Sequence, residues 1–198
     1  MGIILLSQIP ELLFGIYPLW YIYSKKHSYR KLGLISESKK FLLALLIGVL
    51  GGLCLFLINY FSGYLINIIS DAGLDFFEIK ETIDEQNSII QNADVLLIVF
   101  LTILLSLGSF STEIVFRGVL HNTLKERYKN DFKVILFVAL IYSVVMLLFS
   151  FPLGLVYFFV NFIIFTILGL LYEINKNLYN TIIASVIYNL LIIIFLIL

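Results

Sequence analysis

Long, nearly uninterrupted apolar stretches restrict the fold of this chain more than any other feature. A helix needs about 20 apolar residues to cross roughly 30 Å of hydrocarbon, and six stretches of the sequence approach or exceed that length. Hydrophobic residues make up 61% of the 198 positions, which is more than a soluble domain of this size can hide from water. We therefore expect one integral membrane domain over residues 1–198, an all-α, polytopic membrane helix bundle of about six transmembrane helices. The predicted spans are 3–23, 41–69, 95–120, 132–151, 153–172 and 181–198.

The first of these spans is the least regular. Pro10, Glu11 and Pro18 interrupt it, so the sequence leaves open whether it crosses the membrane as a kinked helix or lies partly in the interface.

Charges in the connecting segments predict how the helices are oriented. The segment 24–40 contains six basic residues and one acid, the segment 121–133 is also basic, and the segment 70–94 contains seven acids and one lysine. Because short basic connections stay in the cytoplasm, we expect a multi-pass protein of the cell membrane with both termini extracytoplasmic. The acidic segment 70–94 is then extracytoplasmic, either as a short amphipathic helix on the membrane surface or as a solvated loop.

Composition excludes several classes of function. The 13 basic and 13 acidic side chains cancel, so no overall field attracts nucleic acid, and membrane lipid is the expected surrounding. Cys54 is the only cysteine, which rules out an internal disulfide and a cysteine-based zinc site. We expect no cofactor and no metal.

Glu113 and Arg117 are the most informative polar residues. They lie four residues apart in a predicted span, where charged side chains are costly and mark a functional site by default. The alternative is a structural ion pair in which the Arg117 stem reaches toward the headgroups.

Asn189, in the last span, needs a partner from another helix. Three glycines of the second span are expected to permit close helix packing: Gly51, Gly52 and Gly63.

The segment 112–118, Thr-Glu-Ile-Val-Phe-Arg-Gly, resembles the first signature of the CPBP family of intramembrane metalloproteases. This family, also called Abi, comprises CAAX prenyl endopeptidases and bacteriocin-processing or bacteriocin-immunity proteins. Its first signature reads Glu-Glu-x-x-x-Arg, and Phe-x-x-x-His and His-x-x-x-Asn signatures follow on later helices. Residues 141–147 fall where the second signature belongs, and residues 168–189 look much like the family's last conserved stretch. The resemblance extends over about residues 95–198, the family-like core.

The resemblance implies a degenerate catalytic centre. Glu113, Arg117 and Asn189 occupy family positions unchanged, whereas Thr112 replaces the first glutamate and Met146 and Ser185 replace the two histidines. In the family, the first glutamate and the first histidine are thought to activate water, and the second histidine and the asparagine to stabilise the oxyanion. Threonine is no base at neutral pH and a thioether is a weak acceptor, although Ser185 can still donate a hydrogen bond.

Three functions are compatible with these residues. The first is a catalytically impaired homologue that acts as a binding, scaffold, regulatory or immunity protein for a membrane partner or peptide. The second is a divergent, active intramembrane endopeptidase that uses Glu113, alone or with His121, which lies about 12 Å further along a helix. The third is a small-molecule-binding membrane subunit of a transporter, for which Asn161 and Asn189 are the candidate polar groups.

Overall fold

The structure is a computed structural model that describes residues 15–21, 23–25, 29–35, 37–71, 79–149 and 153–197. These residues form helices and short connections, and no strand occurs among them. The elements are a short 3-10 helix η1 (Tyr29–Leu32), α2 (Ser38–Asp71), α3 (Ile79–Gln91), α4 (Val95–Glu113), a π-helix η2 (Ile114–His121), α5 (Asn122–Arg127), α6 (Asp131–Phe149), α7 (Leu153–Asn175) and α8 (Leu178–Ile197).

Five of the described helical stretches are long and apolar enough to cross a membrane, and they correspond to the second to sixth predicted spans. Their limits are 38–68, 95–127, 131–149, 157–175 and 178–197. The protein is therefore a polytopic membrane helix bundle, as expected. The first predicted span, 3–23, lies mostly outside the described residues, although 15–21 are helical.

The third span is longer than the sequence pattern indicated. Instead of ending at residue 120, the helix continues through η2 and α5 to Arg127, and the expected basic connection 121–133 is reduced to residues 128–130. The physical reason is that the His121 side chain is fully buried and bonded within the protein, so the backbone stays helical beyond the apolar run.

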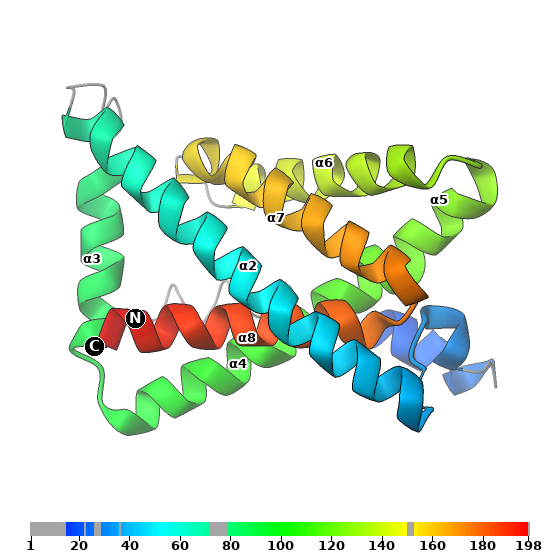
Figure 1. Cartoon of the computed structure of the whole chain (residues 1–198). Helices are drawn as coiled ribbons and strands as arrows, with labels where there is room; N and C mark the ends of the chain where they lie inside the picture. The colour runs from blue at the N-terminus through cyan, green and yellow to red at the C-terminus, as the bar shows by residue number, and fades with distance from the viewer. Residues whose placement is uncertain are drawn as a thin grey trace.

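Helix α2 lies obliquely across α8, and these two helices make the most extensive contact in the bundle (Figure 1). Glycines allow this approach, since a Cβ atom built on Gly52 would lie 2.7 Å from Ile187 Cγ2 of α8. One built on Gly51 would lie 3.3 Å from Ala184 Cβ of α8 and 2.5 Å from Leu171 Cδ1 of α7. The expectation of close packing is confirmed for both. It is wrong for Gly63, where a Cβ atom would meet nothing within 4 Å.

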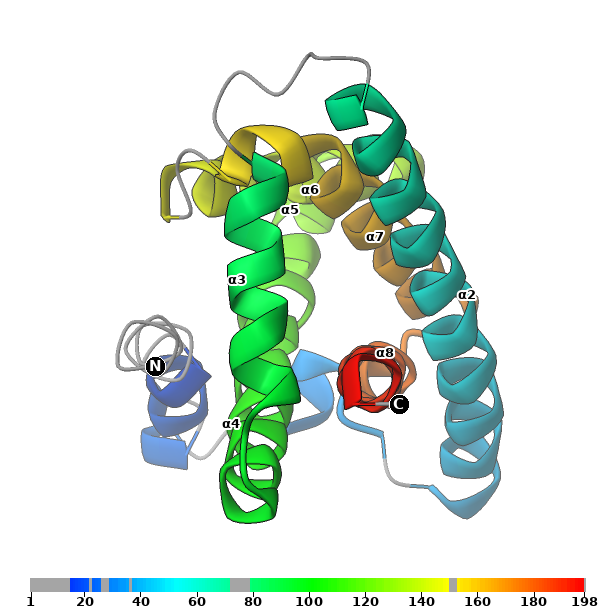
Figure 2. The same cartoon turned by 90° about the vertical axis from the view of Figure 1, so that its left-hand side faces the viewer.

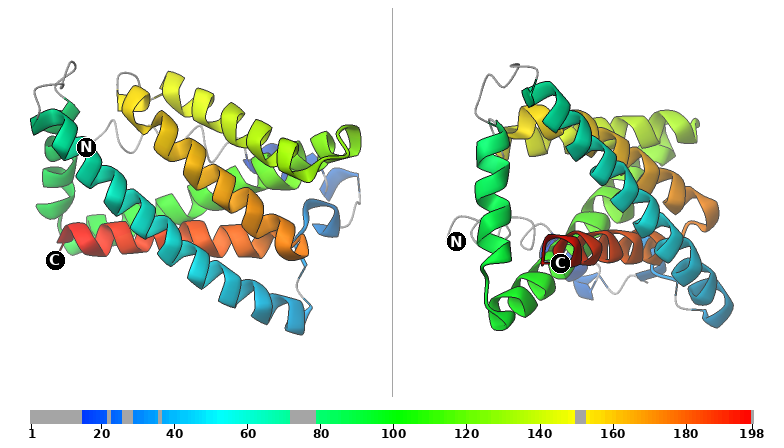
Figure 3. Two further views of the ribbon diagram at one scale, coloured as in Figure 1. Left: turned by 45° about the horizontal axis from the view of Figure 1, so that its top comes forward. Right: turned by 60° about the vertical axis from the view of Figure 1, so that its left-hand side comes forward.

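Helices α6 and α7 form a second, antiparallel layer above α8 (Figure 3). Between the layers lies a buried apolar core that includes Leu55, Ala139, Phe165, Leu168 and Ala184. Outward-facing side chains are also apolar, as Leu50 illustrates with 68% of its surface exposed. Apolar residues on both sides of a helix are what a lipid-facing bundle requires.

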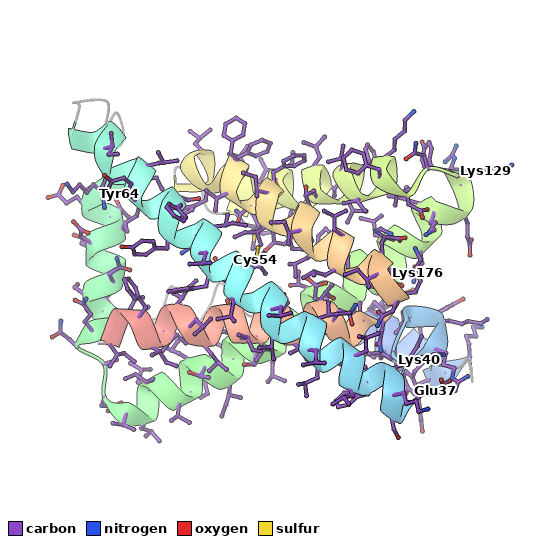
Figure 4. The ribbon with its side chains drawn as sticks, in the orientation of Figure 1. Glu37, Lys40, Cys54, Tyr64, Lys129 and Lys176 are labelled. Carbon is purple, nitrogen blue, oxygen red and sulfur yellow. The ribbon has the colours of Figure 1, made fainter. Side chains whose placement is uncertain are left out.

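The charged segments lie at opposite ends of the bundle. Figure 4 shows Lys40, Lys129 and Lys176 together at one end and Tyr64, near α3, at the other. Helix α3 carries an acidic residue, Glu81, in its first turn and belongs to the acidic segment. The structure thus separates the basic connections from α3 as the predicted orientation requires, while the side that faces the cytoplasm stays a prediction.

Candidate functional site

A cavity of about 220 Å³ lies within the bundle, between α2, α4, α6, α7 and α8. Five of the six residues singled out from the family signatures line it: Thr112, Glu113, Met146, Ser185 and Asn189. The other lining residues are Leu55, Leu105, Ser109, Tyr142, Asn161, Ile164, Phe165, Leu168 and Tyr188. Three segments up to 77 positions apart in sequence (112 to 189) are thus brought to one place.

Helical spacing explains why each signature reaches the cavity. Residues four apart lie on the same face of an α-helix, and the cavity receives Tyr142 with Met146 from α6 and Ser185 with Asn189 from α8. The last turn of α4 contributes Thr112 and Glu113.

The sixth residue, Arg117, lies outside the cavity lining and fully buried. Its Nε atom is 3.9 Å from Oε2 of Glu113, and both side chains are 1% exposed. Its Nη2 atom donates a hydrogen bond of 2.6 Å to the carbonyl oxygen of Phe165, and Cζ lies 3.9 Å from the centroid of the Phe165 ring. The guanidinium therefore binds to α7 inside the protein, and the interpretation in which Arg117 reaches toward the headgroups is wrong.

The backbone at Arg117 is a π-helix, Ile114–His121. A π-helix has i→i+5 hydrogen bonds and occurs mostly as single turns, frequently at functional sites. Ile114, Arg117, Gly118 and His121 are its buried residues, so the four-residue spacing holds Arg117 and His121 on the inner face. Sequence reasoning missed this element, because nothing in the apolar pattern distinguishes a π-turn from an α-turn.

A cluster of ionisable groups extends from the π-helix toward the end of the bundle that carries Lys176 (Figure 4). The Nε2 atom of His121 lies 2.8 Å from Oε1 of Glu173. Lys125 donates to the same carboxylate at 2.9 Å, and Lys176 also pairs with it. His121 is thus bonded to Glu173 on α7 rather than to Glu113, which does not form the displaced acid–base pair considered above.

Sequence reasoning did not single out Glu173. The predicted fifth span ends at residue 172, so Glu173 and Lys176 were expected in a polar connection after it. In the structure α7 continues to Asn175 and includes Glu173. A usable signal was present, because Glu173 and Lys176 are three residues apart, a spacing that places side chains on one helix face.

Asn189 has the interhelical partner that its position required. Its Nδ2 atom donates a hydrogen bond of 2.9 Å to Ser109 Oγ on α4. Nearby, the hydroxyl of Tyr188 donates to Oδ1 of Asn59 on α2 at 3.2 Å. Ser109 and Tyr188 both line the cavity and were not recognised from the sequence, because neither belongs to a family signature.

The cavity wall supplies hydrogen-bonding groups but few groups that can carry out hydrolysis. Among the described residues that line it, Glu113 is the only one with a carboxylate, and none is a histidine. A catalytic metal ion needs about three protein ligands, and no group of three His, Cys, Asp or Glu side chains suited to a metal occurs among the described residues. The residues around the cavity therefore do not fit a bound metal ion.

The fold and the cavity define a membrane helix bundle with a small, polar-lined internal site assembled from α4, α6, α7 and α8. Residues 94–191 match the family model described as type II CAAX prenyl endopeptidase Rce1-like. The chain belongs to this family, and the matched segment begins just before α4 and ends within α8. No curated protein and no solved structure matches the chain.

Proposed function

We propose that this protein is a catalytically impaired member of its family that binds a short peptide segment of a membrane partner without cleaving it. The observation that carries the proposal is the composition of the cavity. By the resemblance, Thr112, Met146 and Ser185 are expected at the positions of the family's reactive groups, and they line the same cavity as Glu113 and Asn189.

Hydrolysis needs a proton acceptor close to the attacking water and donors directed at the developing oxyanion. Thr112 and Met146 provide no effective base. Hydrogen-bond donors for an oxyanion are present, because Ser185 and the Asn189 amide both line the cavity. A site that holds a carbonyl group but activates no water binds a peptide without breaking it.

The size and lining of the cavity also favour a peptide segment. Its volume of about 220 Å³ is below the roughly 300–1,000 Å³ of sites that enclose a whole drug-sized ligand. Hydroxyl and amide groups from Ser109, Asn161 and Tyr188 line it beside the apolar side chains of Leu105 and Leu168. Such a wall suits one side chain and the adjacent backbone of a bound segment.

One observation favours an active endopeptidase as the second candidate. Glu113 lines the cavity. A carboxylate at a cavity wall is an acceptor for a proton from water. The guanidinium of Arg117, 3.9 Å away, stabilises the charged form of this carboxylate.

Binding and cleavage can be measured on the same sample. Purified protein in nanodiscs is incubated with fluorescent C-terminal-motif peptides, prenylated and unprenylated, together with a peptide library. Anisotropy reports binding, and mass spectrometry reports peptide integrity. We expect at least one peptide to bind and to be recovered intact. Cleavage by the wild type, or no binding of any peptide by folded protein, would contradict the proposal.

A pair of substitutions ties the binding to the cavity. Leu105→Trp places a larger ring in the cavity lining and is expected to weaken peptide binding. Leu107→Trp makes the same change on the same helix, where the side chain is 49% exposed and faces away from the cavity. Equal effects of the two variants would show that the peptide binds elsewhere.

A further inference from the structure

A second and larger cavity, of about 480 Å³, lies at the end of the bundle next to α3. Residues of α2, α3, α7 and α8 line it. Figures 1 and 2 show α2, α3 and α8 on three sides of this end of the bundle. Asn161 and Tyr188 line both this cavity and the central one. No family signature falls in its remaining lining.

Aromatic rings form much of the wall. Phe56, Tyr60 and Tyr64 come from α2, Tyr157 from α7, and Tyr188 and Phe195 from α8. The ring of Phe195 packs edge-to-face against Phe56, at 5.8 Å between centroids, and against Tyr60, at 5.7 Å. These contacts join the rings of α2 and α8 at the cavity wall.

The polar part of the described cavity wall carries one negative charge and no positive charge. Asp84 on α3 is the only charged residue among the described residues that line this cavity. Four amides accompany it: Asn59, Asn67, Asn87 and Asn161. None of the described lining residues is basic, so no ion pair within the cavity wall neutralises the carboxylate.

We infer that this cavity binds a small organic cation, an ammonium group carried on an apolar body. Aromatic faces attract ammonium ions, and aromatic cages are a recurrent way of recognising quaternary ammonium groups. A carboxylate adds charge complementarity, and the amides can bind a hydroxyl or carbonyl group of the ligand. The volume of about 480 Å³ lies within the roughly 300–1,000 Å³ typical of small-molecule sites. This inference is independent of the proposed peptide binding.

Gly63 gives a direct way to close the site. It lines the cavity, and a Cβ atom built on it would meet nothing within 4 Å. A leucine at this position therefore adds bulk at the cavity wall without colliding with its first neighbours, whereas an alanine leaves most of the volume free.

The test is calorimetric titration of the full chain in phosphatidylglycerol nanodiscs with choline and with 3,3-dimethylbutan-1-ol, its uncharged isostere. We expect saturable binding of choline and none of the alcohol. Gly63→Leu should abolish choline binding and Gly63→Ala should preserve it, with both variants checked for the wild-type unfolding temperature.

The carboxylate has a matched control on the same helix. Asp84→Asn should weaken choline binding roughly fivefold, the effect of one partly screened charge. Glu85→Gln removes the same charge from a neighbouring position outside the cavity lining and should leave binding unchanged. Equal losses in both variants, equal binding of choline and its isostere, or no choline binding by folded wild type would overturn the inference.

Lipid composition identifies the source of the cation. The two membranes are compared at high salt, which screens the surface charge of phosphatidylglycerol. Weaker binding of free choline in phosphatidylcholine nanodiscs then means that lipid headgroups already occupy the cavity. Unchanged affinity means that the cavity takes a water-soluble amine. Either result supports the inference.

Discussion

The central cavity and the adjacent charge cluster of Arg117, His121 and Glu173 differ in the charge and the bonding of their side chains. On the cavity wall, Thr112, Met146 and Ser185 are uncharged. Behind it, Arg117, His121 and Glu173 are ionisable and bonded to protein groups on neighbouring helices. Both regions adjoin Glu113, which lines the cavity and also faces Arg117.

The two regions are constrained differently: protein stability constrains the charge cluster but not the uncharged residues of the cavity wall. A buried charge without a partner is very costly, so the cluster cannot be altered one residue at a time without loss of stability. The uncharged cavity positions carry no such constraint. The helices around the site can therefore remain in place when residues of the cavity wall change.

The largest expected effect comes from breaking the charge cluster. Arg117→Met leaves Glu113 buried without its cation, and we expect the free energy of unfolding to fall by about 3–5 kcal/mol. Reversible unfolding in mixed micelles measures the change. Arg127→Met removes an exposed arginine at the end of α5 and should change stability by less than about 0.5 kcal/mol. Similar values for the two variants would contradict the comparison drawn here.

Helix packing should give an intermediate effect. A methyl group on Gly52 would lie 2.9 Å from the backbone oxygen of Ala184 as well as close to Ile187, so Gly52→Ala is expected to cost about 1–3 kcal/mol through overpacking. Gly63→Ala enters open space and should be neutral or stabilising by up to about 1 kcal/mol because alanine favours a helix. The same unfolding measurement distinguishes them, and the reverse order would refute the packing described for α2 and α8.

The smallest effect is expected at the cavity wall. Asn189 and Ser109 share one hydrogen bond, and such interhelical bonds contribute about 0.6 kcal/mol on average in membrane proteins. A double-mutant cycle with Asn189→Ala and Ser109→Ala should give a coupling energy of that order. A coupling above about 2 kcal/mol would mean that this wall is as stringently constrained as the charge cluster.

Much of the architecture and the site could be predicted from the sequence. The length of the apolar stretches predicted the spans, because hydrocarbon thickness sets how long a membrane-crossing helix must be. The family resemblance singled out Glu113, Met146 and Asn189, which line one cavity. The π-helix and the pairing of His121 with Glu173 could not be predicted. The first changes the hydrogen bonding without changing composition, and the second joins residues 52 positions apart. Gly63 was misjudged because a glycine in an apolar run indicates close packing only when another helix faces it.

Introducing the family's carboxylate and imidazole groups at the cavity wall tests whether their absence prevents peptide cleavage. A variant carrying T112E, M146H and S185H has a carboxylate and two imidazoles at cavity positions that now lack them, and we expect it to cleave a peptide that the wild type only binds. Mass spectrometry of the reaction detects the products. Their loss on adding E113Q would show that Glu113 also takes part in the restored chemistry.

The central claim, that the native cavity binds without hydrolysing, is tested most directly by comparing wild type with Glu113→Gln in the peptide cleavage assay. Both proteins are first shown to be folded in nanodiscs. We predict no cleavage above background for either protein. Cleavage by the wild type that disappears in the folded Glu113→Gln variant would contradict the claim and establish an active endopeptidase.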